Sequence, residues 1–99
     1  MHYAPRTRLQ IVDCISNFIV QNPNLNIGVL TLGKTVMEQS NATSIQLSIT
    51  GDLEEASANL YKAMYDLDGM DLDCIIIEKF PEIGIGKSLN DRISRASFR

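Results

Sequence analysis

The 99-residue sequence has little of what marks several classes of protein. Its longest uninterrupted apolar run is the four-residue stretch Cys74–Ile77, whereas a membrane span needs roughly 20 apolar residues. No basic and then apolar leader opens the chain, so we expect a cytoplasmic protein that does not enter a membrane. With 44% hydrophobic and 21% charged residues, three prolines and six glycines, the composition favours one folded domain over a disordered chain.

Cysteine and histidine are also scarce. Cys14 and Cys74 lie sixty residues apart with no C-x-x-C motif, so neither a disulfide framework nor a zinc site is indicated. His2 is the single imidazole, and no second ligand, nucleophile or base stands near it in the sequence. We therefore predict no metal, no cofactor and no catalytic residue in this chain.

Positive charge is scarce in the middle of the chain. Residues 9–86 carry three lysines against eleven acidic residues, a local charge of −8, within an overall charge of −3. Such an acidic body disfavours binding to a phosphate backbone across the whole surface. Arg92, Arg95 and Arg99 recur at helical spacing, however, and form a candidate docking surface for an acidic partner or tRNA. A solvated helix face is the alternative interpretation of the same spacing.

Strand and helix patterns alternate along the chain. Residues 8–12, 27–32, 45–49 and 74–78 read as strands, and helices follow Asp13, Asp52 and Gly86, with Asp13 and Asp52 as predicted caps. The stretch from 34 to 41 is ambiguous and could hold one helical turn. This order predicts an α/β fold: a Rossmann-like three-layer fold with a mostly parallel sheet of about four or five strands.

The common strand order 3-2-1-4 would place the third and fourth strands at the two edges. Ile45, Leu47 and Ile49 alternate with polar residues, as an edge strand with one buried face does. The fourth strand fits its edge position less well, because its Cys-Ile-Ile-Ile run looks buried on both faces. Covering helices, a further strand or a partner could account for that burial.

In this order a ligand crevice would open between the first and fourth strands. The residues predicted to line it are Asp13, Gly84, Gly86 and Lys87. Gly86-Lys87-Ser88 is similar to the end of a phosphate-binding loop, but Pro81 stands where that motif needs its first glycine. A nucleotide-hydrolysing loop is therefore disfavoured, while a domain that senses a small ligand or nucleotide remains an alternative function.

Several short motifs keep their order and spacing over nearly the whole chain: His2-Tyr3-Ala4-Pro5, Asn59-Leu60-Tyr61, Leu67-Asp68, Gly84-Ile85-Gly86, Asn90-Asp91-Arg92 and Arg95-Ala96. Together they resemble the carboxyl-terminal domain of the two-domain threonylcarbamoyl-AMP synthases, the larger relatives of the YrdC proteins. The resemblance implies a Rossmann-like domain, residues 9–99, preceded by a remnant of the interdomain linker, residues 1–8. It also implies that His2, Tyr3 and Pro5 approach the active site of a neighbouring catalytic domain.

The function implied by this resemblance is accessory. The full enzymes join L-threonine, bicarbonate and ATP into threonylcarbamoyl-AMP, which is used to modify tRNA. The resemblance places that chemistry, with its ATP, in a YrdC-like catalytic domain whose residues are not in this sequence. We therefore expect this chain to pack against that domain and help cover its active site, with tRNA or tRNA-modification proteins as further possible partners, and not to be catalytic alone.

Overall fold

The computed structural model describes residues 5–33 and 39–97, and these residues alternate between strands and helices. The predicted α/β fold is confirmed. The predicted helical turn around Val36 lies outside the described residues. The elements are β1 (Leu9–Ile11), α1 (Ile15–Gln21), β2 (Ile27–Leu32), β3 (Ala42–Ser48), α2 (Leu53–Asp68), β4 (Cys74–Ile77) and α3 (Ile85–Ser97).

The four strands of the described residues form one parallel sheet in the order β1-β4-β2-β3. The predicted order 3-2-1-4 is therefore wrong, because β4 lies between β1 and β2 and not at an edge. Ile77 pairs with Ile11 on one side and with Leu30 on the other. This central position explains the unbroken apolar run of β4, since both faces of an inner strand are covered.

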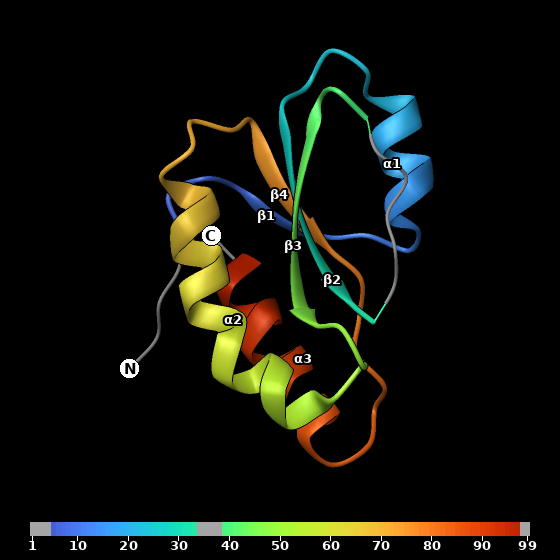
Figure 1. The fold of residues 1–99 in the computed structure, drawn as a ribbon, viewed down its shortest axis with the longest axis vertical. Coiled ribbons are helices and arrows are strands. Elements are labelled where there is room, and N and C mark those ends of the chain that lie inside the picture. The colour runs from blue at the N-terminus through green and yellow to red at the C-terminus, as the bar shows by residue number, and fades with distance from the viewer. Residues whose placement is uncertain (1–4, 34–38, 98–99) are drawn as a thin grey trace.

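Helices cover the sheet on both faces, which makes the three predicted layers. Figure 1 shows α1 alone on one side, and α2 and α3 side by side on the other. Residues of β4 alternate between the two cores: Cys74 and Ile76 pack with α1, whereas Ile75 and Ile77 pack with α2 and α3. All four are buried, so β4 ties the two layers of helices together.

The edge strand β3 is confirmed, but its buried face is shorter than predicted. Leu47 is buried and Ile45 is half-buried, whereas Ile49 is 80% exposed. The difference arises because the chain turns after Ser48, whose carbonyl oxygen accepts hydrogen bonds from the amides of Gly33 and Gly51. Ile49 therefore lies beyond the last paired residue of β3. It is at the end of the sheet where the strands have their carboxyl termini, which we name the carboxyl edge.

The predicted cap of α2 is confirmed. Asp52 precedes the helix, and its side chain accepts a hydrogen bond of 3.2 Å from the Glu55 amide. The apolar positions that follow are buried against the sheet and α3, as their spacing predicts. They are Ala56, Leu60, Ala63, Met64 and Leu67.

Candidate functional site

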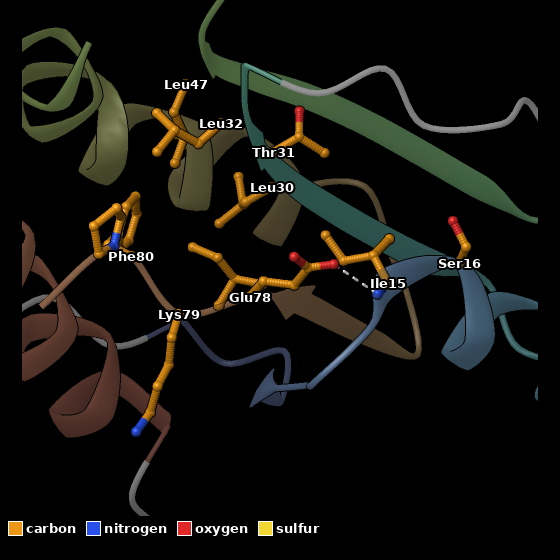
Figure 2. A pocket seen from close by; sticks show the side chains of 11 residues that line it. Ile15, Ser16, Leu30, Thr31, Leu32, Leu47, Glu78, Lys79 and Phe80 are labelled. Carbon is orange, nitrogen blue, oxygen red and sulfur yellow. Dashed lines mark hydrogen bonds between the residues drawn. The ribbon is translucent and has the colours of Figure 1, made fainter. Parts of the chain in front are cut away.

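The carboxyl ends of β2 and β4 border a cavity of about 500 Å³, which we name the central hollow. Figure 2 shows the side chains that line it, which come from α1, β2, β3, the last residue of β4 and the loop after it. Its walls are mainly apolar: Leu30, Leu47 and Phe80 are buried on one side. An apolar cavity with few polar groups, at the carboxyl edge of a parallel sheet, is where ligands of such folds bind.

Glu78 is the acidic group of the central hollow, and it caps α1. The Ile15 amide donates a hydrogen bond of 2.9 Å to Glu78 Oε2, drawn as a dashed line in Figure 2. The predicted cap, Asp13, is wrong: the residue preceding the helix is Cys14, and no side chain next to the helix caps it. Glu78 brings negative charge to the helix end that would otherwise favour a phosphate, so a nucleotide phosphate fits poorly there.

Thr31 contributes a second polar group to the wall of the central hollow. The residue is only 5% exposed, and its hydroxyl oxygen has no hydrogen-bond partner among the described residues. A buried hydroxyl usually has a partner, because leaving it unpaired is unfavourable. Thr31 was not predicted as a site residue, because a threonine in a strand pattern gives no sign of function.

A second, shallower cavity lies between the ends of β1 and β4, as the predicted crevice does; we name it the loop hollow. Gly84 and Lys87, two of the four predicted crevice residues, line it. Its charges are mixed, since Lys79 and Lys87 share it with Glu82 and Asp91. A mixed lining of this kind does not favour an anion over a cation.

The other two predicted crevice residues do not line either hollow. Asp13 is exposed on the loop before α1. Gly86 is buried, and a Cβ atom there would lie 1.8 Å from the Pro81 carbonyl oxygen. The glycine is therefore needed for the close packing of the loop on α3, and no ligand is required to explain it.

Asn90 holds the loop between the two hollows. The Phe80 amide donates a 2.8 Å hydrogen bond to Asn90 Oδ1, and Asn90 Nδ2 donates one of 2.9 Å to the Phe80 carbonyl. The same nitrogen also donates to Glu82. Asn90 is buried on the otherwise apolar inner face of α3. It was not predicted as a site residue, and a polar residue within an apolar stripe is the sequence signal that would have pointed to it.

The predicted arginine surface is partly engaged within the domain. Arg92 donates to Ser57 Oγ at 3.2 Å and lies 5.8 Å from the centre of the Tyr61 ring. Arg95 pairs with Asp91 at 2.9 Å. Arg99 lies outside the described residues, and docking by this surface stays a prediction.

Of the predicted linker residues, Pro5 is buried against the domain, whereas His2 and Tyr3 lie outside the described residues.

Burial raises the pKa of the Cys74 thiol, with a smaller contribution from Asp73 and an opposing one from Arg8. Over residues 5–33 and 39–97, no group of three His, Cys, Asp or Glu could hold a metal, and no helix is long and apolar enough to cross a membrane.

Comparison with known proteins gives a consistent result. Residues 1–97 match the family described as threonylcarbamoyl-AMP synthase, C-terminal domain. The chain is 30% identical to threonylcarbamoyl-AMP synthase of Bacillus subtilis (strain 168), over 97% of this chain and 30% of that protein. It also resembles the crystal structure of P. abyssi Sua5 complexed with L-threonine, with a TM-score of 0.76 and 26% identity over 97% of this chain and 29% of that one. The chain thus spans less than a third of these relatives.

Proposed function

This chain belongs to the family of threonylcarbamoyl-AMP synthase C-terminal domains, and on that premise we propose that it is an accessory domain. It packs against a YrdC-like catalytic domain, holds the linker between the two, and helps to cover the active site. The catalytic domain supplies the ATP site and joins L-threonine, bicarbonate and ATP into threonylcarbamoyl-AMP for tRNA modification.

The observation that carries this proposal is how firmly the start of the chain is attached to the domain. Pro5 is buried, and the Arg8 carbonyl oxygen accepts a 2.8 Å hydrogen bond from the Ile75 amide of the central strand. Residues 5–8 of the segment that the resemblance assigns to the linker are therefore part of the packed domain. A cover that excludes water would protect the mixed anhydride of threonylcarbamoyl-AMP, which hydrolyses readily.

The experiment is to assay the catalytic domain with and without this chain, joined to it or added separately. Pyrophosphate release from ATP in the presence of L-threonine and bicarbonate is the measurement. We expect the chain to raise the yield of threonylcarbamoyl-AMP per pyrophosphate released. An unchanged yield, with no association between the two proteins, would refute the accessory role.

The central hollow supports a second candidate function, the binding of a small ligand. The Glu78 carboxylate and the Thr31 hydroxyl, which has no partner among the residues that the structure describes, favour an uncharged or amine-bearing ligand over a nucleotide phosphate. Calorimetry with L-threonine, AMP and ATP on this chain tests the idea. Saturable binding of L-threonine that Thr31→Val weakens would support it; Gly86 is unsuitable for this test because its substitution disturbs the loop itself.

A further inference from the structure

Asp68 occupies an unfavourable electrostatic position. It is the last residue of α2, where the helix end carries partial negative charge, and the last turn of α2 contains no basic residue. An acidic side chain there destabilises the helix unless donors elsewhere compensate. A residue that stands against the helix dipole in this way must be satisfied by contacts from outside its own helix.

Those contacts come from the start of the chain, more than sixty residues earlier. The Arg6 amide donates to Asp68 Oδ2 at 3.1 Å, and the Thr7 amide and hydroxyl donate to Oδ1 at 2.8 and 2.7 Å. Figure 1 shows the first described residues passing beside the C-terminal end of α2. We name residues 5–8 the entry segment.

Two successive backbone amides bound to one carboxylate fix more than the position of a side chain. They fix the peptide planes of the entry segment, and so the direction in which the preceding chain leaves the domain. On the other side of Thr7, the Arg8 carbonyl joins the ladder of β4, and Leu9 is buried. The entry segment is thus held to the sheet at one end and to α2 at the other.

We propose that Asp68 is a positioning residue, which sets the orientation of this domain relative to the catalytic domain by fixing the exit direction of the linker. The inference rests on the proposed function for the existence of that neighbour. It predicts that the Asp68 carboxylate, acting through the entry segment, affects how the active site is covered without touching substrate.

The first test uses this chain alone and compares Asp68→Asn with Asp66→Asn. Both variants remove one negative charge from the end of α2, but among residues 5–33 and 39–97 the Asp66 side chain makes only the exposed pair with Lys62. Amide hydrogen exchange at residues 6 and 7 is the measurement. We expect Asp68→Asn to accelerate it on the order of tenfold, because hydrogen bonds to a charged group are lost, and Asp66→Asn to leave it unchanged.

Thr7→Val provides a second variant if Asp68→Asn folds poorly. It keeps the branched side chain and both amide donors and removes only the hydroxyl donor to Asp68. We expect a smaller acceleration at residue 7 than Asp68→Asn gives. Equal exchange at residues 6 and 7 in the wild type, Thr7→Val and Asp68→Asn would overturn the proposal, whatever the chain does to the catalytic domain.

The second test joins the chain to its catalytic domain and measures the distribution of distances between one spin label on each domain. We expect a broader distribution in Asp68→Asn than in Asp66→Asn, with no difference in unfolding that could explain it. Equal distributions in the two variants, with faster exchange at residues 6 and 7, would overturn the proposal. Cutting the chain away tests the accessory role separately, because that result does not depend on Asp68.

Discussion

Different groups lie at the amino edge of the parallel sheet, where the strands begin, and at its carboxyl edge, where they end. At the amino edge, carboxylates close the surface onto backbone amides: Asp68 binds the entry segment, and Asp73 accepts a 2.7 Å hydrogen bond from the Asn26 amide. At the carboxyl edge, two hollows open, and Ile49 and Ile83 are largely exposed. The comparison indicates that the amino edge is closed by contacts within the domain, while the carboxyl edge has the room for a ligand or partner.

The strongest way to disturb the carboxyl edge is Gly86→Ala. The added Cβ would strike the Pro81 carbonyl oxygen, which is backbone and cannot move aside without moving the loop. We expect a loss of about 3 kcal/mol in the free energy of unfolding, measured with urea. The control is Gly84→Ala, where an added Cβ would meet nothing within 4 Å and only the positive φ of 54° is unfavourable. A loss as large in Gly84→Ala would contradict this explanation.

Asn90→Ala tests whether the loop between the hollows depends on its buried amide. The substitution leaves the Phe80 amide and carbonyl without their partner, so we expect a loss of about 2 kcal/mol in unfolding free energy. Asn59→Ala is the matched control, because within the described part of the chain the Asn59 side chain donates a single hydrogen bond, to the Leu47 carbonyl. We expect about half the effect there, and equal losses would mean that the loop is held by other contacts.

At the amino edge, the reactivity of the Cys74 thiol tests whether that residue is buried. Because burial raises the Cys74 pKa above its ordinary value of 9.0, we expect a thiol reagent at pH 8 to label the half-buried Cys14 well before Cys74. A raised folded pKa also means that Cys74 contributes stability that is present below pH 9 and is lost as the pH rises through the folded value. Asp73→Asn lowers the Cys74 pKa slightly, so faster labelling above pH 8 is expected. Equal labelling of both cysteines in the folded chain would contradict the burial.

The smallest effect on stability is expected from Ile49→Ser. Ile49 is 80% exposed, so the free energy of unfolding should change by less than about 0.5 kcal/mol. If the carboxyl edge faces the catalytic domain, the same substitution weakens their association, which titration by calorimetry would measure. Val20→Ser, at an exposed position on α1, is the control. Equal affinities of the two variants would place the interface away from Ile49.

Local patterns predicted much of this fold, because they depend on neighbours in the sequence. The Asp52 cap and the buried stripe of α2 follow from short-range rules, as does the edge position of β3. The position of β4 in the sheet could not be predicted in the same way. Four consecutive apolar residues predict burial on both faces, but they do not predict which strands lie beside β4. The predicted burial of β4 on both faces already conflicted with an edge position, and this conflict pointed to the error in the predicted strand order.

The candidate site was predicted less completely, because its key contacts join distant residues. Glu78 caps a helix 63 residues earlier, and Asp68 binds Thr7 from 61 residues away. Neither spacing follows a local rule, so Asp13, adjacent to α1, was the natural but wrong choice of cap. Gly84 and Lys87 were predicted to line a crevice between the first and fourth strands, and they line the loop hollow because β1 and β4 are neighbours in the observed order as well.

The most direct test of a supporting, non-reactive role is the hydrolysis rate of threonylcarbamoyl-AMP bound to the catalytic domain. We expect slower hydrolysis with this chain present, and a return toward the rate of the catalytic domain alone in Asp68→Asn but not in Asp66→Asn. An identical hydrolysis rate with and without the chain would contradict the role. So would turnover of ATP by the chain alone.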